Sequence, residues 1–147
     1  MATKIFVNLP VTDLARARGF FTALGFAFDP RFSDDTAAGM VVSDDTFVML
    51  LTTAKFQEFT PRPVADATRS TEVLVCLTRE RREDVDDLVR RAIAAGGALH
   101  APPKDYGFMH QHGFQDLDGH IWEVIHLDPK AASGAPESPP PRAGSKR

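Results

Sequence analysis

Residues 114–123, which read FQDLDGHIWE, carry the clearest structural pattern in this chain. Asp and Gly in its centre, from Asp116 to Gly119, are typical of a tight turn, because Asp bonds nearby backbone amides and Gly adopts left-handed angles. Strands are expected on both sides, over 112–115 and 120–126. The stretch therefore predicts a turn that joins two neighbouring strands.

This turn belongs to the second of two similar halves of the chain, each with the predicted order strand, helix and three strands. In the first half the helix is capped by Thr12 or Asp13, and Gly25 ends it; in the second half Thr78 is the expected cap. The first half contains strand 4–9 closed by Pro10, helix 14–24, and strands 26–29, 39–42 and 46–51. The second contains strand 71–77, helix 81–95 ended by Gly96 and Gly97, and strands 98–101, 112–115 and 120–126.

The two halves match at an offset of 66 residues near their first strands and 73 near their last. A repeat of this length is too long for a solenoid and indicates a duplicated supersecondary unit. Two tandem βαβββ modules predict an α+β fold whose mixed sheets each carry a helix on one face and curve around a cleft with the other. We expect a single domain over 1–128, with modules at about 3–60 and 70–128.

The composition favours a small-molecule partner for this domain. The 147 residues carry a net charge of −3, which gives no general reason to expect nucleic-acid or membrane binding. The single cysteine, Cys76, cannot form an internal disulfide, its place in a strand pattern predicts burial, and the first residues lack the order of a secretion signal. A cytoplasmic protein is therefore expected.

Residues 129–147 differ from the rest of the chain. They are rich in Pro, Ala and Ser, contain four basic residues and one Glu, and hold no large apolar side chain. Such a segment buries too little surface to offset its ordering entropy, so we expect a disordered tail.

Two motifs resemble the vicinal oxygen chelate superfamily, which includes glyoxalase I, extradiol dioxygenases, and fosfomycin- and bleomycin-resistance proteins. One is VNLPVTDL at 7–14, followed by Phe20, Phe21 and LGF at 24–26; the other is the stretch 114–123. The second is similar to the family pattern F-x-D-P-D-G-x-x-x-E, with Leu117 in place of proline. The resemblance covers about residues 3–128 and implies the family fold, often as a homodimer.

Metal-using relatives take ligands from the first and last strand of each module. Carried onto this chain, the resemblance implies four positions: Phe6, Leu50, Glu72 and Glu123. Only the two glutamates can bind a metal, so the usual four-ligand site is incomplete. No cofactor is assigned; a divalent metal, if present, would use Glu72, Glu123 and His112.

Glu123 is the candidate catalytic or ligand-contacting residue. Strand alternation places it on one face with Ile121, and places Glu72 on one face with Leu74. If these faces line a cavity, two carboxylates lie among apolar side chains, where one of them can act as a base or attract a cation. The alternative is that Glu123 has no functional role and that its carboxylate is hydrogen-bonded to backbone or water.

Four histidines gather near the last two strands, but alternation places His120 and His126 opposite Glu123. The sequence does not show on which face of the sheet His112 lies, so His112 stays a candidate beside Glu123. His100 carries no signal.

The loop 102–109 supplies Tyr106, Phe108 and Met109, which form either a flexible apolar rim over a ligand or a loop anchor. The predicted ligand-binding residues are Phe6, Leu50, Glu72, Leu74, Tyr106, Phe108, His112 and Ile121.

Three functions remain open at this point. The first is a metal-independent protein of the bleomycin-resistance type that binds a small molecule in an apolar cleft near Glu123. The second is a metal-dependent lyase or isomerase that resembles lactoylglutathione lyase, or a dioxygenase-like enzyme. The third is a non-catalytic accessory module.

Overall fold

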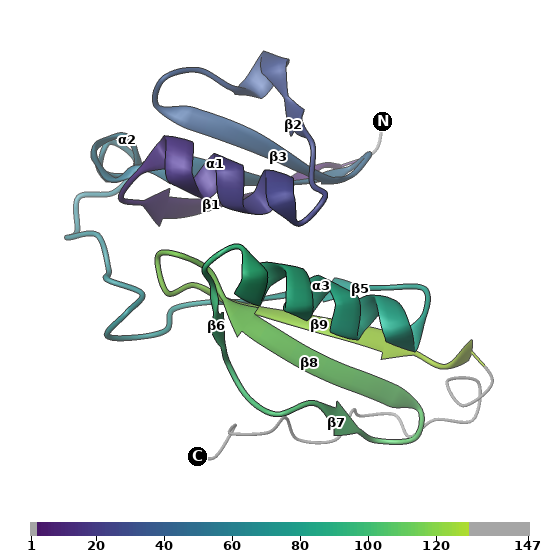
Figure 1. Ribbon diagram of the computed structural model, residues 1–147. Coiled ribbons are helices and arrows are strands. Elements are labelled where there is room, and N and C mark those ends of the chain that lie inside the picture. Colours follow the sequence, from purple (N-terminus) through teal and green to yellow (C-terminus); the bar gives the residue numbers. More distant parts are fainter. Residues whose placement is uncertain (1–2, 130–147) are drawn as a thin grey trace. The chain divides into compact units, whose positions relative to one another are not determined.

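The computed structural model describes residues 3–129 of the chain (Figure 1). These residues form two compact units, which divide between Glu72 and Val73. Each unit contains a mixed sheet and one long helix, so the predicted α+β class is confirmed. The predicted disordered tail lies outside the described residues, apart from its first residue, Pro129.

In the first unit, four strands of the described chain form a sheet in the order β1-β4-β3-β2. β1 and β4 are parallel, and the other neighbours are antiparallel. The elements are β1 (Ile5–Val11), α1 (Leu14–Ala23), β2 (Phe28–Asp29), the 3-10 helix η1 (Pro30–Phe32), β3 (Ala37–Ser43), β4 (Thr46–Thr52) and α2 (Thr53–Gln57). Pro10 was expected to end the first strand, but it lies inside β1. β1 is an edge strand, and an edge strand tolerates proline.

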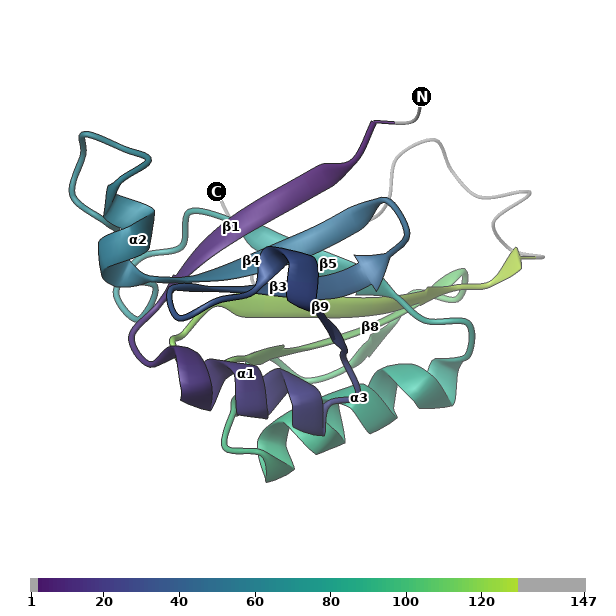
Figure 2. The ribbon, with the colours of Figure 1, turned by 90° about the horizontal axis from the view of Figure 1, so that it is seen from above.

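The helix α1 covers one face of this sheet (Figure 2). The Asp13 side chain accepts a 3.0 Å hydrogen bond from the Arg16 amide and so caps the helix start. Gly25, with φ of 101°, follows the helix in the left-handed conformation that ends many helices. Phe20 and Phe21 are buried.

In the second unit, β8 and β9 form the centre of the sheet, and β5 is parallel to β9. Two short strands, β6 and β7, both pair with β8 at the other edge. The elements are β5 (Leu74–Thr78), α3 (Arg82–Ala94), β6 (Ala98–Leu99), β7 (Lys104–Asp105), β8 (Met109–Gln115) and β9 (Ile121–Leu127). Thr78 belongs to β5, so the prediction that it caps the helix is wrong; Arg81 occupies that position.

The two faces of the second sheet differ. Phe114, Trp122 and Val124 are fully buried on the face that α3 contacts. Glu123 lies on the opposite face, here called the open face, because successive strand residues alternate in direction. His126 lies on the α3 face, where its Nδ1 is 3.1 Å from the Arg79 carbonyl oxygen. None of the helices within residues 3–129 has the length and apolar character needed to cross a membrane.

The turn between β8 and β9 is organised by Asp116. Its Oδ1 accepts hydrogen bonds from the amides of Asp118 (2.9 Å) and His120 (3.0 Å), and its Oδ2 accepts one of 3.0 Å from Trp122 Nε1. Gly119 has a φ of 90°, which favours glycine. Burial raises the pKa of Asp116. The Asp116 carboxylate thus connects the turn to the core.

Asp105 anchors the loop for which a flexible rim and a loop anchor were both open. Its carboxylate accepts a 2.6 Å hydrogen bond from Arg82 on α3 and a 2.8 Å bond from the Gly107 amide. The Arg82 guanidinium, followed by the Gly107 amide, lowers the pKa of Asp105 to about 2. The anchoring contacts therefore require an ionised Asp105.

This anchor predicts a specific loss of stability in acid. Because the folded pKa lies below the ordinary value, the contribution is present above about pH 4 and is lost as the pH falls towards 2. We expect Asp105→Asn to reduce the dependence of the urea unfolding midpoint on pH in this range. Arg82→Met should have the same effect, because it removes the partner. An unchanged pH dependence in both variants would contradict the anchor.

Candidate functional site

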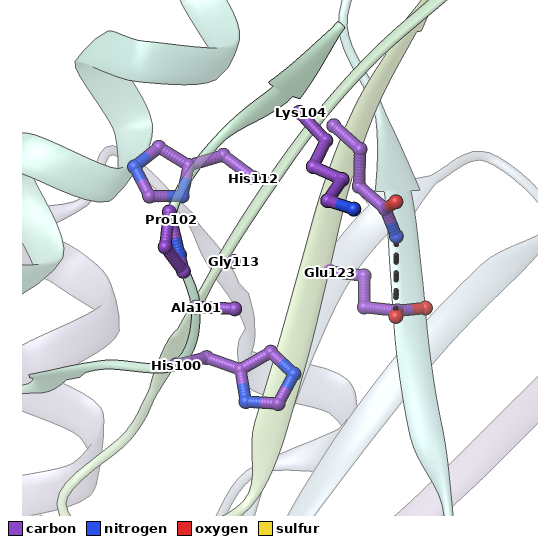
Figure 3. Close-up of a pocket in the computed structure, with 8 residues that line it drawn as sticks. His100, Ala101, Pro102, Lys104, His112, Gly113 and Glu123 are labelled. Atoms are coloured by element: carbon purple, nitrogen blue, oxygen red, sulfur yellow. Dashed lines mark hydrogen bonds between the residues drawn. The ribbon is translucent and has the colours of Figure 1, made fainter. Parts of the chain in front are cut away.

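A pocket opens at the edge of the second sheet (Figure 3). It opens to solvent, and its enclosed space of about 10 Å³ is about the size that holds one water molecule. This is far smaller than a pocket that encloses a drug-sized molecule, so the pocket has room for one small polar group at the end of a ligand. Its lining residues are His100, Ala101, Pro102, Lys104, Gln111, His112, Gly113 and Glu123.

The pocket exists because the edge strand is interrupted. β6 pairs with β8 at Phe114 and Gln115, and β7 pairs with β8 at His110 and Gln111. Between β6 and β7 the chain leaves the sheet at 100–103, where two consecutive prolines disfavour strand pairing. His112 and Gly113 of β8 therefore face this gap.

Gly113 lies where the backbones of β8 and β9 approach closely. A Cβ at this position would lie 2.9 Å from the Trp122 carbonyl oxygen and 3.4 Å from His100 Cδ2. Its register partner on β9 is Glu123. The close approach of the Trp122 backbone thus favours glycine at position 113, beside Glu123.

Two polar side chains form the buried part of the pocket. Glu123 is 4% exposed and Gln111 is 7% exposed. The Gln111 amide nitrogen donates a 3.3 Å hydrogen bond to Glu123 Oε2. Among the described residues, Gln111 Oε1 has no hydrogen-bond partner. A buried acceptor without a partner costs about 1–3 kcal/mol, so the folded chain carries an uncompensated cost at this oxygen.

Basic side chains stand at the mouth of the pocket. Lys104 is exposed and is the register partner of Gln111, and His100 is half-buried. Figure 3 shows the side chains of Lys104 and His100 directed towards Glu123 from different ends of the pocket. The pocket therefore combines a carboxylate, an amide oxygen, an ammonium group and an imidazole.

Apolar side chains continue the open face beside Glu123. Cys76 is the register partner of Glu123 on β5, and Leu74 is the partner of Ile121. Leu74 is 42% exposed, and Ile121 and Ile125 are half-buried. A molecule whose polar end enters the pocket can therefore lay a hydrocarbon part on this face.

The sequence pattern of the Glyoxalase/Bleomycin resistance protein/Dioxygenase superfamily matches residues 5–124. The chain belongs to this superfamily. The predicted family resemblance is thereby confirmed, and it covers both units.

Solved structures of the superfamily fold are similar to this chain. A hypothetical protein from S. aureus has 29% identity and a TM-score of 0.74, with 86% of this chain and 95% of that chain covered. TioX from Micromonospora sp. ML1 has 26% identity and a TM-score of 0.60, with 86% and 99% covered. A glyoxalase-related enzyme from Fulvimarina pelagi, at 23% identity and a TM-score of 0.71 with 86% and 88% covered, supports the fold alone. No curated protein matches the chain.

The structure turns His112 away from Glu123. His112 is the register partner of Val124, so its side chain belongs to the α3 face, although it borders the pocket at the sheet edge. Figure 3 shows its ring pointing away from Glu123. Burial lowers the pKa of His112, which keeps it neutral at pH 7. The hypothesis that His112 and Glu123 share a metal is therefore wrong.

Tyr106 and Phe108 lie outside the pocket lining. The Tyr106 amide donates a 2.7 Å bond to the Met109 carbonyl oxygen, and the Phe108 carbonyl oxygen accepts a 2.9 Å bond from the Asp128 amide. Both side chains are half-buried, and Met109 is buried. These contacts fit the alternative of a loop anchor.

Leu50 lies on the wrong face for its predicted role. It is the register partner of Leu9, is 0% exposed, and belongs to the buried face of the first sheet. The neighbouring residue Met49, partner of Asn8, belongs to the other face. The repeat alignment was wrong by one residue here, and a shift of one residue reverses the direction of every side chain.

Glu72 and Cys76 also differ from their predictions. The strand expected from residue 71 begins only at Leu74, so Glu72 precedes it and is exposed. The register partner of Glu123 is therefore Cys76. Cys76 is exposed, because it lies on the open face, and not buried as its strand position suggested.

Phe6 lies on the less buried face of the first sheet. It is 40% exposed, stacks on Phe47 at 4.8 Å and meets the edge of Phe32 at 5.2 Å. The family resemblance places Phe6 at a ligand position. In this chain Phe6 belongs to an aromatic cluster, which offers no lone pair to a metal.

These residues do not fit the metal centre of metal-using members. Phe6 and Leu50 lack donor atoms, Glu72 lies outside its strand, and His112 faces α3. Within residues 3–129, His, Cys, Asp and Glu side chains form no group of three or more with a metal-binding arrangement. The groups that the site offers to a ligand are therefore a carboxylate, an amide and basic side chains.

Sequence reasoning did not find Gln111, Gly113, His100 or Lys104. Two features of the sequence did indicate an irregular strand at this place, namely Gly113 and the prolines 102–103. A glycine inside a strand often marks a close approach or an opening, and a pair of prolines interrupts an edge strand. Neither signal shows which side chains meet at the opening.

Proposed function

We propose that the protein binds a small organic molecule on the open face of the second sheet, with the polar end of that molecule in the pocket. Glu123 and Gln111 contact the polar end, and Leu74, Ile121 and Ile125 contact the hydrocarbon part. The function is that of a binding protein of the glyoxalase and bleomycin-resistance type that does not use the four-ligand metal site.

One observation carries this proposal: the buried Gln111 Oε1 has no hydrogen-bond partner among the described residues, and Gln111 is one of the residues that line the pocket. Buried amide oxygens are almost always satisfied in folded proteins. A ligand that donates a hydrogen bond to this atom removes the cost of leaving it unsatisfied.

The proposed setting is a cytoplasmic homodimer. An exposed thiol at Cys76 is compatible with a reducing compartment. The mass of the protein in solution, measured by light scattering, tests the dimer independently of ligand binding.

The binding function predicts fragment hits at one place. In a screen of fragments by ¹H–¹⁵N NMR of the full chain, we expect compounds that shift the Gly113 amide and the Gln111 side-chain amide. Glu123→Gln should weaken these compounds about tenfold or more, because a charged acceptor is lost from a buried site. Glu72→Gln, an exposed control of the same chemistry, should leave them unchanged.

Two results would contradict the proposal. One is a set of fragments none of which shifts these resonances. The other is a stoichiometric divalent metal in protein purified without chelator that disappears in Glu123→Gln, which would favour the metal-dependent enzyme instead.

A further inference from the structure

We propose that this pocket selects a neutral hydroxyl group, carried on an apolar carbon skeleton, over an amine or a carboxylate. This inference rests on the proposed function and specifies the ligand class for the same site.

The first step is the donor that the ligand must supply. Gln111 Nε2 donates a hydrogen bond of 3.3 Å to Glu123 Oε2, and Gln111 Oε1 stays buried and without a partner among the described residues, on a side chain that lines the pocket. This oxygen only accepts hydrogen bonds. The entering group must therefore carry a hydrogen on nitrogen or oxygen, which an ionised carboxylate lacks.

The second step is the acceptor that the ligand must supply. Lys104 and His100 point towards the same space, and an ammonium group offers three donors and no acceptor (Figure 3). A ligand group that lies between these two side chains and Gln111 forms the most hydrogen bonds if it also accepts a hydrogen bond. A protonated amine has no acceptor, whereas a hydroxyl group has one donor and two acceptor lone pairs.

The third step is the charge of the pocket. Glu123 contributes one negative charge and Lys104 one positive charge, and His112 is neutral at neutral pH. Asp105, next to Lys104, is already paired with Arg82 at 2.6 Å. The pocket is therefore close to neutral, so neither a cation nor an anion gains a net attraction that compensates for its loss of hydration.

The fourth step is the skeleton. Leu74, Ile121 and Ile125 border Glu123 on the open face, and they offer only hydrocarbon surface. A polyol would leave its further hydroxyl groups against these side chains without partners. The favoured ligand thus has one hydroxyl end and an apolar body.

The test compares benzyl alcohol, benzylamine and benzoate, which share one ring and differ in the polar group. Each is titrated into the ¹⁵N-labelled full chain while the Gly113 amide and the Gln111 side-chain amide are observed. We expect benzyl alcohol to bind about tenfold more tightly than the other two, which corresponds to about one hydrogen bond.

Two variants make the test specific. Gln111→Leu should weaken benzyl alcohol about tenfold, whereas Gln115→Leu, on the same face of β8 but outside the pocket lining, should not. Lys104→Met removes a positive charge from the pocket lining, so it should raise the affinity for benzylamine relative to benzyl alcohol about tenfold. Lys104 is exposed, so this variant is expected to fold even if Gln111→Leu does not.

The outcomes separate the two proposals. If benzylamine or benzoate binds best to the unmodified protein, or if Lys104→Met leaves the order unchanged, the hydroxyl inference is overturned while small-molecule binding stands. If none of the three compounds shifts the pocket resonances, binding at this site is contradicted as well.

Discussion

Leu50→Glu is expected to unfold the first unit or to lower its free energy of unfolding by about 5 kcal/mol, whereas Met49→Glu is expected to cost about 1 kcal/mol. Leu50 is 0% exposed and shares its face with Leu9 and Val48, so a carboxylate there is buried among hydrocarbon. Met49 is half-buried on the other face, in register with Asn8.

Chemical unfolding followed by far-UV circular dichroism measures this difference. The two variants introduce the same side chain at neighbouring positions of β4, so each is the control for the other. A folded Leu50→Glu protein together with an unfolded Met49→Glu protein would mean that β4 presents Leu50 on the other face. That result would restore the ligand position that the repeat alignment predicted.

Asp116→Ala is expected to lower the free energy of unfolding by about 3–5 kcal/mol. The Asp116 carboxylate is 6% exposed and accepts bonds from the amides of Asp118 and His120 and from Trp122 Nε1. Without it, the Trp122 indole nitrogen, on a fully buried side chain, loses this acceptor. The substitution also leaves the turn amides without the group that orders them.

Urea unfolding observed through the fluorescence of Trp122, the single tryptophan of the chain, measures the effect in the second unit. Asp116→Asn retains one amide oxygen as an acceptor and should cost less than Asp116→Ala. Asp44→Ala, in the exposed turn between β3 and β4, should change stability by less than about 0.5 kcal/mol. Equal losses for Asp44→Ala and Asp116→Ala would show that the carboxylate has no special role.

The superfamily motif around residues 114–123 thus has a structural meaning in this chain. Asp116 and Gly119 build the turn, Trp122 fills the core against Phe114, and Glu123 faces the opposite direction. Sequence reasoning recognised the motif and placed Glu123 on the face opposite Trp122. It did not assign Asp116 a role, because three hydrogen bonds to one carboxylate depend on how the turn folds back.

Local patterns predicted the main elements of the fold well. Asp13 caps α1 and Gly25 ends it, because caps and left-handed positions depend on neighbouring residues only. The short strand β7 and the short helix α2 were not predicted. They are held by pairing with β8 and by contact with β1 and β4, which local propensity does not show.

The sequence by itself determined the α+β class, the duplicated order of elements and the superfamily, because periodicity, turn residues and motifs are properties of neighbouring positions. Only the tertiary structure decided the register of the strands, which buries Leu50, exposes Cys76 and places Glu123 beside Gly113. It also decided the site, because the gap between β6 and β7 brings Lys104 and His100 to the side chains of Gln111 and Glu123. Register and edge pairing depend on contacts between residues far apart in the chain, and a shift of one position exchanges the faces of a sheet.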